Sequence, residues 1–595
     1  MGRTVMGSIE PRISDLAARL RKLEVLSSQE RGPRMSEKDR VQDASSKIRQ
    51  RTEIADQLPL DDGDLVIESN NQSLLAAVGD ADGDEKFRIR VYTVEPDNVQ
   101  LVYLEAPISP RVLAFGRGFL WIRRDQSLRP HQLIWWDGAC SDPTILIDEV
   151  DPECRLELRS TDGDAAILVS RGARTSRSWV VTCVGQGVPS CQLVKPRGPD
   201  DVVTISQQSL VVLDRQNGHL WDHGRDHLLS ETPIGFAAEN LQRSNGGIVV
   251  IGRFDGRKAV WVPEQGTSAI WIAPPAGTIL PAFDSVDKRL KLLVSSPVHK
   301  PQVVPATEGT ELLLEPNRPV STIRTSASSE DGTRIPITLF LPPGERKYPV
   351  VVHVYGAYGI SLEGPFDPFN DDLLAREVAV AFCHVRGGGE LGAQWHRQAT
   401  GKHRHRSVDD LLACLAEIRS LPHVDSERVA VTAASAGGLV AAAACLRQPT
   451  WIRGLHLVHP FIDPLATLLD PSSNLSSTDR AEYGDPRDDV TIRNAIERIS
   501  PLACLEKLLP RSHPLPRVWI RAAERDARAD GEAIYEFAQR YGSVSVSRHP
   551  GHVIHRIASG GHLHGGSYED TINENALAHA WMLDVLEVTP ECSRR

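Results

Sequence analysis

The segment Val429-Ala-Val-Thr-Ala-Ala-Ser-Ala-Gly-Gly-Leu-Val-Ala-Ala-Ala-Ala444 sets a serine between an apolar run and a run of small, helix-forming residues. Residues 429–432 predict a buried strand, and residues 437–444 predict a helix. Ser435 therefore lies on a tight strand-to-helix turn, which lifts its hydroxyl above the sheet and points helix N-terminal N–H groups toward an incoming carbonyl oxygen. Ala433 stands where the usual Gly-x-Ser-x-Gly pattern has its first glycine. A turn of small residues that merely packs is the alternative interpretation.

Two residues further along the chain complete a candidate nucleophile, acid and base. Asp526 follows the predicted strand 515–522, and 526 − 435 = 91 residues separate it from Ser435. His562 comes 562 − 526 = 36 residues later, in a loop whose glycines allow an imidazole to approach the serine. This chain order is typical of α/β-hydrolases, so we expect a doubly wound, mostly parallel sheet. His564 is a competing base, and we prefer His562 because a glycine precedes it.

Four motifs around these residues follow one pattern, namely Tyr355-Gly-Ala-Tyr-Gly-Ile-Ser361, His384-Val-Arg-Gly-Gly-Gly-Glu-Leu-Gly392, Ala434-Ser-Ala-Gly-Gly438 and Pro460-Phe-Ile-Asp463. From about Ser326 to Val588 the sequence resembles the prolyl oligopeptidase family of serine peptidases, and most of all its oligopeptidase B branch. The resemblance implies a serine oligopeptidase that hydrolyses short or unfolded peptides through an acyl-enzyme. It also implies an N-terminal β-propeller that restricts access to the site.

The resemblance assigns roles to individual side chains. Three of them match the family's nucleophile, acid and base, namely Ser435, Asp526 and His562. The Tyr355 hydroxyl and the Ala436 N–H match the oxyanion hole, where two donors stabilise developing negative charge. Arg528 matches an arginine that holds a substrate carbonyl, and a surface cation is its alternative interpretation.

The residues that match the substrate subsites depart from the oligopeptidase B pattern. Of two acids associated with a basic residue at the cleaved bond, Asp479 is kept and Ala481 replaces the other. Of two acids at the neighbouring subsite, Glu363 is kept and Pro365 replaces the other. A guanidinium prefers a bidentate carboxylate, so halving the acids weakens the expected preference for basic residues.

The N-terminal part of the chain has a different composition. From about residue 64 to 314, short β-branched runs alternate with polar turns, and four stretches repeat a turn followed by an inner strand, near residues 69–78, 160–169, 244–251 and 287–294. We expect a β-propeller over 55–315, with seven blades implied by the resemblance, and a hydrolase domain over 316–595. Residues 1–54 are expected to form an arm that packs on the hydrolase domain, with an amphipathic helix over 12–26.

The composition limits the classes of partner and compartment. A net charge of −11 gives nucleic acid no electrostatic reason to bind, and the sequence shows no apolar run of membrane-spanning length. Nine scattered cysteines without a Cys-x-x-Cys pair suit reduced thiols, so we expect a cytoplasmic protein. We expect no cofactor and no metal, and short peptides as partners, with monomer or dimer left open.

Three functional alternatives stay open from the sequence. The same triad would serve a non-peptide esterase or amidase, because fold and triad do not fix the substrate. A catalytically weakened scaffold is the second, suggested by Ala433 and the missing subsite acids. The third lies within the peptidase interpretation and is a protease that matures one small peptide.

Overall fold

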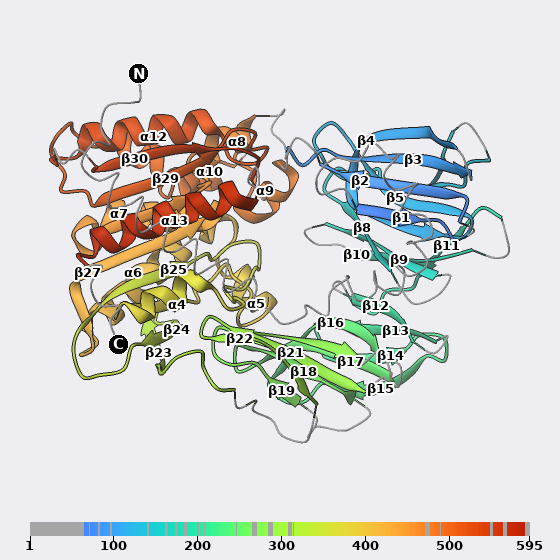
Figure 1. The fold of residues 1–595 in the computed structure, drawn as a ribbon, viewed down its shortest axis with the longest axis horizontal. Helices are drawn as coiled ribbons and strands as arrows, with labels where there is room; N and C mark the ends of the chain where they lie inside the picture. The colour runs from blue at the N-terminus through green and yellow to red at the C-terminus, as the bar shows by residue number, and fades with distance from the viewer. Residues whose placement is uncertain are drawn as a thin grey trace. The chain divides into compact units, whose positions relative to one another are not determined.

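The computed structural model describes residues 65–588 with gaps at 71, 81–83, 96–97, 140–141, 161–164, 173–175, 184–186, 199–200, 207–208, 245–246, 264–269, 284–288, 307–311, 313, 471–475, 488, 548–550 and 563–567. The predicted helix 12–26 and His564 lie outside the described residues. Within these ranges, residues 65–231 belong to one compact unit and residues 232–588 to a second (Figure 1). Over the described part of the chain, every helix is too short or too polar to cross a bilayer.

The first unit consists of antiparallel sheets whose strands follow each other in chain order. One sheet has the order β1-β2-β3-β4-β5-β6-β7, with β1 Leu65–Glu68, β2 Leu74–Gly79, β3 Phe87–Glu95, β4 Asn98–Phe115, β5 Gly118–Arg124, β6 Pro130–Trp136 and β7 Thr144–Asp148. A second has the order β11-β10-β9-β8, with β8 Arg155–Ser160, β9 Ala165–Arg171, β10 Ser176–Thr182 and β11 Ser190–Val194. A third contains β12 Asp201–Ser206, β13 Ser209–Asp214, β14 His219–Asp222 and β15 His227–Glu231.

The long strand β4 serves two of these four-strand units. Its first half pairs with β3, from Asn98 to Ile108, and its second half pairs with β5, from Ile108 to Phe115. The register shifts on both sides of Ile108, so one strand closes the unit β1–β4 and opens the unit β4–β7. The sequence repeat is irregular here because no turn separates the two units.

The second unit begins with two more sheets of the same kind. They contain β16 Phe236–Ser244, β17 Gly247–Phe254, β18 Arg257–Trp261 and β19 Ile270–Ile272 in one sheet, and β20 Thr278–Phe283, β21 Leu290–Ser296 and β22 His299–Pro305 in the other. Antiparallel meanders of this size are the blades of β-propellers, and the predicted propeller architecture is confirmed. With β4 counted twice, the described strands form six such units, and the seventh blade stays a prediction.

The four repeated stretches of the sequence form corresponding strands. They are β2, β9, β17 and β21, and each pairs with a neighbour on both sides. Their burial explains the apolar runs: in β17, for example, each of the first seven residues is buried. Inner strands were therefore predictable where apolar residues follow a polar turn.

The remainder of the second unit contains one eight-stranded sheet in the order β23-β24-β26-β25-β27-β28-β29-β30. Its strands are β23 Ser321–Ser328, β24 Arg334–Leu341, β25 Tyr348–Val354, β26 Ala379–Cys383, β27 Val424–Ala434, β28 Gly454–Val458, β29 Arg517–Ala523 and β30 Val553–Ala558. The first two strands are antiparallel, and the six from β26 to β30 run parallel. The predicted α/β-hydrolase sheet is confirmed.

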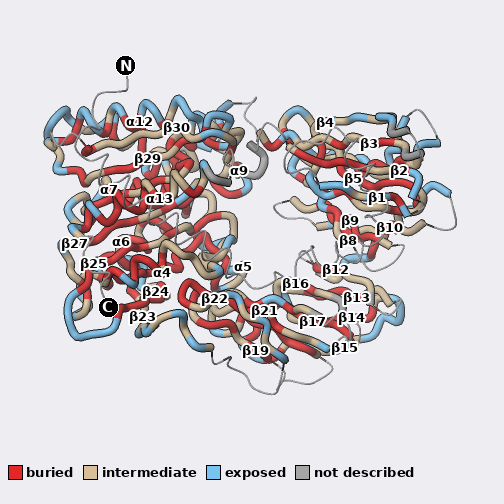
Figure 2. Tube along the Cα trace, viewed as in Figure 1, coloured by how far each residue is buried: buried red, intermediate tan, exposed pale blue. Residues whose placement is uncertain are grey.

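Helices cover both faces of this sheet, whose central strands are buried (Figures 1 and 2). One face packs on α6 (Arg406–Ser420), α7 (Ser435–Arg447), α11 (Pro501–Glu506) and α12 (Gly531–Val544). The other face packs on α4 (Pro368–Ala375) and α13 (Tyr568–Val585). The shorter helices are α5 (Ala393–Arg397), α8 (Pro464–Leu469), α9 (Ser476–Tyr483) and α10 (Val490–Glu497). Side chains alternate along each strand, so the two faces form separate cores.

The face covered by α4 and α13 also carries polar side chains that are half-buried or buried. His353 on β25 places Nε2 3.0 Å from Asn370 Oδ1 of α4, and its ring stacks on Phe382 at a centroid distance of 4.7 Å. On the neighbouring strands, Thr432 Oγ1 lies 2.9 Å from His456 Nδ1. Burial lowers the pKa of His353 to about 4. The hydrogen bond with Asn370 acts in the opposite direction and raises this pKa, but its effect is smaller. Burial also lowers the pKa of His456 to about 3.

The domain boundaries predicted from the sequence were 1–54, 55–315 and 316–595. The eight-stranded sheet begins at Ser321, close to the predicted start of the hydrolase domain. The division into compact units falls earlier, between β15 and β16, so the last two propeller sheets group with the hydrolase sheet. The functional boundary between the domains stays a prediction.

Candidate active site

Ser435 lies at the junction of β27 and α7, where the backbone takes an unusual conformation. Its φ angle is 52°, in the left-handed region that residues with a side chain rarely adopt. Such a conformation costs about 1–3 kcal/mol and persists only where the surrounding structure fixes it. Here the preceding strand pairs with β25 and β28, and the Ser435 carbonyl accepts a hydrogen bond from the Phe461 N–H at 3.0 Å. The serine is therefore held in a strained turn, as the strand-turn-helix pattern predicts.

The two glycines after Ser435 allow α7 to approach the ends of neighbouring strands. A Cβ at Gly437 would lie 2.8 Å from the Val354 carbonyl oxygen, and one at Gly438 would lie 2.6 Å from Pro460 Cβ. On the other side of the serine, Ala433 is 6% exposed and belongs to the hydrophobic core. The methyl group that replaces the usual first glycine is thus accommodated by packing.

The structure brings Ser435, His562 and Asp526 together from three different loops. His562 Nε2 lies 2.9 Å from Ser435 Oγ, across 127 residues of sequence. His562 Nδ1 lies 3.0 Å and 2.9 Å from the two carboxylate oxygens of Asp526. The side chains of the histidine and the aspartate are 6% and 2% exposed. An imidazole in this position can take a proton from the hydroxyl while the carboxylate fixes its tautomer.

Asp526 is anchored by the turn that follows it. Its Oδ1 accepts hydrogen bonds from the backbone N–H groups of Arg528 at 2.9 Å and Ala529 at 2.8 Å. Burial raises the pKa of this carboxyl, but the nearby His459 ring and the hydrogen bond and charge of His562 hold the pKa well below its usual range. The acid therefore stays ionised beside the imidazole.

His459 is the one residue of this cluster that the sequence reasoning missed. It follows β28 directly, and its Nδ1 lies 3.4 Å from Asp526 Oδ2. Its ring centroid is 5.7 Å from that of His562. A single histidine within Val458-His-Pro-Phe461 carries no recognisable spacing, and only the pairing of β28 with β29 reveals its proximity to the aspartate.

The predicted oxyanion-hole residues lie beside the serine. Tyr355 follows β25, and Ala436 is the second residue of α7, where backbone N–H groups have no acceptor within the helix. Burial raises the pKa of Tyr355, and so does the charge of Glu482. The charges of Arg404 and Arg528 lower that pKa, and so does a hydrogen bond with Ser435. The tyrosine thus keeps its proton and can donate it in a hydrogen bond.

The two predicted subsite acids both have partners within the protein. Asp479 is 8% exposed and accepts a hydrogen bond from the Tyr358 hydroxyl at 2.8 Å. Glu363 forms an ion pair with Arg253 of β17, which is itself 3% exposed. Arg253 contacts Glu239 as well, so Glu363 belongs to a buried charge cluster of the second unit. A substrate cation would compete with Arg253 for this carboxylate.

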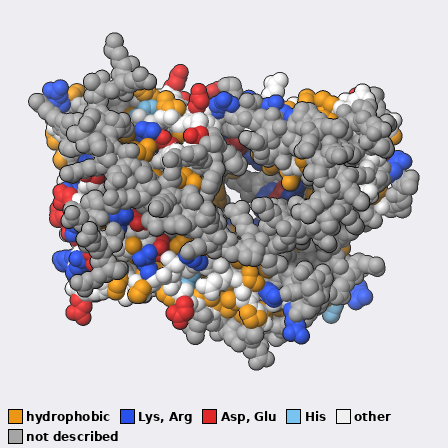
Figure 3. Space-filling model, viewed as in Figure 1, with side chains coloured by type: hydrophobic (Ala, Val, Ile, Leu, Met, Phe, Trp, Pro, Cys, Tyr) orange, Lys and Arg blue, Asp and Glu red, His pale blue; other side chains and the backbone are white. Residues whose placement is uncertain are grey.

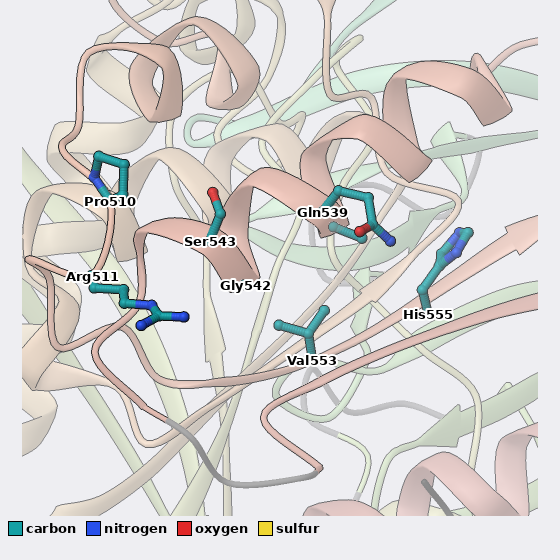
Figure 4. Close-up of a pocket in the computed structure, with 8 residues that line it drawn as sticks. Pro510, Arg511, Gln539, Gly542, Ser543, Val553 and His555 are labelled. Carbon is teal, nitrogen blue, oxygen red and sulfur yellow. The ribbon is translucent and has the colours of Figure 1, made fainter. Parts of the chain in front are cut away.

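Acidic and basic side chains are interspersed on the described part of the face in Figure 3. A depression lies between α12 and β30, lined by residues that include Arg511, Gln539, Ser543 and His555 (Figure 4). Its lining contains none of the residues predicted for catalysis. Over the described part of the chain, no three His, Cys, Asp or Glu side chains group as metal ligands.

An eight-stranded α/β sheet, a serine on its strand-to-helix turn and a histidine that bridges this serine to an aspartate define the α/β-hydrolase class. Residues 366–588 match the model of the prolyl oligopeptidase family. This segment of the chain is a prolyl oligopeptidase family domain.

Known proteins extend the comparison beyond this segment. The chain is 32% identical over 319 residues to the prolyl endopeptidase-like protein of Gallus gallus. The aligned region covers 50% of this chain and 42% of that protein. The chain thus matches less than half the length of this relative. Oligopeptidase B from Leishmania major has the same fold, with a TM-score of 0.76 and 17% identity over 89% of this chain and 80% of that one. Oligopeptidase B from Trypanosoma brucei, in a closed form with covalently bound antipain, gives a TM-score of 0.73 and 21% identity over 88% and 79%.

Proposed function

We propose that this protein is a serine peptidase that hydrolyses short or unfolded peptides through an acyl-enzyme. The observation that carries the proposal is the double contact of His562, with Ser435 on one nitrogen and Asp526 on the other. The family of residues 366–588 supports peptide bonds as the target. The covalently bound antipain of the T. brucei structure is in keeping with a site that forms covalent adducts.

In the proposed mechanism, His562 Nε2 accepts the proton of Ser435 Oγ as that oxygen attacks the peptide carbonyl carbon. Asp526 stabilises the imidazolium that results. The negative charge that develops on the carbonyl oxygen is bound by the Tyr355 hydroxyl and the Ala436 N–H. His562 then protonates the leaving amine, and a water molecule activated by the same histidine hydrolyses the acyl-enzyme.

Arg528 is the proposed anchor for a substrate carbonyl. Its backbone N–H holds Asp526, and its charge acts on Tyr355, so its side chain belongs to the surroundings of the oxyanion hole. An Arg528→Gln variant should raise KM for peptides of three or more residues more than it lowers kcat, because it removes binding shared by substrate and transition state. Equal KM values for variant and wild type would remove this role.

The preference at the cleaved bond is the finer part of the proposal. Asp479 is the acid proposed to select a basic residue. Ala481 replaces the second acid at this subsite, and Arg253 neutralises Glu363 at the neighbouring one. A cleavage profile over a peptide library, with wild type and Asp479→Asn, tests the assignment. Loss of Arg and Lys at the cleaved position in the variant supports it, and an unchanged profile contradicts it. Cleavage confined to one peptide sequence would instead identify a maturation protease.

The decisive experiment compares Ser435→Ala with the wild type on fluorogenic peptides and on aryl esters. We expect wild-type turnover of peptides, and a loss of about 10⁴-fold or more in the variant with an unchanged fold. A fluorophosphonate probe should label the wild type and Ser543→Ala, an exposed control serine, but not Ser435→Ala. Ester turnover without peptide turnover would establish the esterase alternative, and absent labelling of the wild type would establish a scaffold.

Two further parts of the proposal concern access and compartment. We propose that the N-terminal propeller limits substrates by size, so turnover of a series of peptides of increasing length should stop sharply above one length.

We also propose a cytoplasmic location. Seven cysteines in the described ranges are free thiols, as expected for a reducing compartment. Cell fractionation tests the location, and the oligomeric state stays open to measurement.

A further inference from the structure

His459 occupies a fixed position next to the triad acid. Its backbone has a φ of 46°, and its N–H donates to the Arg521 carbonyl oxygen at 2.7 Å. The residue is 7% exposed. Its Nδ1 is buried and makes no hydrogen bond in the described structure, and it lies 3.4 Å from Asp526 Oδ2. A polar ring buried this far, on a strained backbone, is expected to use its polar atom.

Both carboxylate oxygens of Asp526 take part in the cluster, and His562 Nδ1 lies 3.0 Å from Oδ1 and 2.9 Å from Oδ2. Oδ1 accepts the backbone N–H groups of Arg528 and Ala529, which fix one edge of the carboxylate. Oδ2 faces the two histidines, His562 at 2.9 Å and His459 at 3.4 Å. A carboxylate has room for about four hydrogen-bond donors, so both rings can donate to it together. The two imidazole rings thus both lie within 3.4 Å of Oδ2 of the carboxylate.

The ionisable groups that face His459 are Asp526, His562 and Arg521. Burial lowers the pKa of His459, the bond with Asp526 raises it, and the charges of Arg521 and His562 lower it. The ring is therefore neutral at neutral pH and carries one N–H. A neutral donor can orient the carboxylate without placing a second cation beside the imidazolium that forms on His562 during catalysis.

We propose that His459 is a positioning residue of the triad, whose Nδ1–H donates to Asp526 Oδ2 and holds this carboxylate against His562. The inference rests on the proposed peptidase function. Donation to Asp526 also makes the carboxylate less basic, so His562 holds its catalytic proton less tightly.

The test compares His459→Asn with His459→Ala. An asparagine amide can place its N–H where Nδ1 stands, and asparagine tolerates the left-handed backbone of this position. We expect His459→Asn to keep kcat within about threefold of wild type, and His459→Ala to lower kcat by about tenfold with KM unchanged, as loss of a hydrogen bond to a charged group predicts. The acid limb of kcat/KM should move up by roughly half a pH unit in the alanine variant alone.

His459→Asp provides a second variant with the same shape as asparagine. Its carboxylate repels Asp526, so the acid limb should move further up than in the alanine variant. An unchanged acid limb in both His459→Ala and His459→Asp overturns the proposal. Equal loss of kcat in the asparagine and alanine variants overturns it too, because the histidine would then serve packing alone. Failure of the proposed function is distinguishable, since the wild type itself would lack turnover that depends on Ser435.

Discussion

Two half-buried histidines on the face of the sheet covered by α4 and α13 predict a specific loss of stability in mild acid. His353 and His456 have folded pKa values of about 4 and about 3, against about 6.5 in an unfolded chain. Below the unfolded value the unfolded state binds more protons than the folded state, so stability falls with pH from about 6.5 downward. At pH 5 an unfolded histidine gains about 2.1 kcal/mol from protonation, whereas a folded one with a pKa of about 4 gains less than about 0.1. Each ring therefore costs about 2 kcal/mol at pH 5.

The assay is urea unfolding of the full chain at pH 8 and pH 5, followed by circular dichroism. His353→Gln places an amide nitrogen where Nε2 contacts Asn370, so it keeps the hydrogen bond and removes the titration. The loss of unfolding free energy between pH 8 and pH 5 should be about 2 kcal/mol smaller in this variant than in wild type. His456→Asn, which imitates Nδ1 beside Thr432, should give a similar difference.

The exposed His227 provides the matched control, because its ring meets water in the folded chain as in the unfolded one. His227→Gln should leave the pH dependence of wild type unchanged. If His353→Gln and His456→Asn also lose as much stability as wild type between pH 8 and pH 5, the reasoning from half-buried neutral histidines is refuted.

Three further predictions concern single contacts. Tyr355→Phe should lower kcat on peptides by about 10²–10³-fold with an unchanged urea midpoint, as loss of an oxyanion donor requires, and steady-state kinetics with wild-type rates would exclude this role. Gly438→Ala should cost about 1–3 kcal/mol in urea unfolding, because its Cβ would lie 2.6 Å from Pro460 Cβ; a variant as stable as wild type would mean that Pro460 moves freely. Arg253→Met should cost about 3 kcal/mol in the same assay by leaving Glu363 without its cation, and adding Glu363→Gln should recover part of that loss; a double-mutant cycle without coupling energy contradicts the pairing.

The catalytic sheet was predictable because its sequence signals are local. An apolar run, a tight turn and a helix of small residues identify β27, Ser435 and α7 without knowledge of the rest of the fold. Asp526 could be selected because it lies in a loop after an apolar run, and His562 because glycines surround it, while chain order limits the choices. The structure places His562 beside Ser435 and Asp526 beside His562, and their catalytic roles stay proposals.

The contacts that the sequence did not reveal join residues far apart in the chain. Glu363 and Arg253 are 110 residues apart, and nothing in either segment indicates that a propeller strand supplies the partner of this acid. His459 approaches Asp526 only because β28 and β29 are neighbours in the sheet. The shared strand β4 likewise leaves no visible repeat in the sequence, because one continuous strand replaces the turn that would mark a blade.

The 127 residues between Ser435 and His562 have a consequence for the newly made polypeptide. A ribosome that has just released the serine elbow into solution has not yet synthesised the base, and β30 must still join the edge of the sheet before the imidazole arrives. A half-made chain can therefore display a nucleophile but cannot use it. Under the proposed mechanism, hydrolysis cannot begin before synthesis has passed His562 and β30 has joined the sheet.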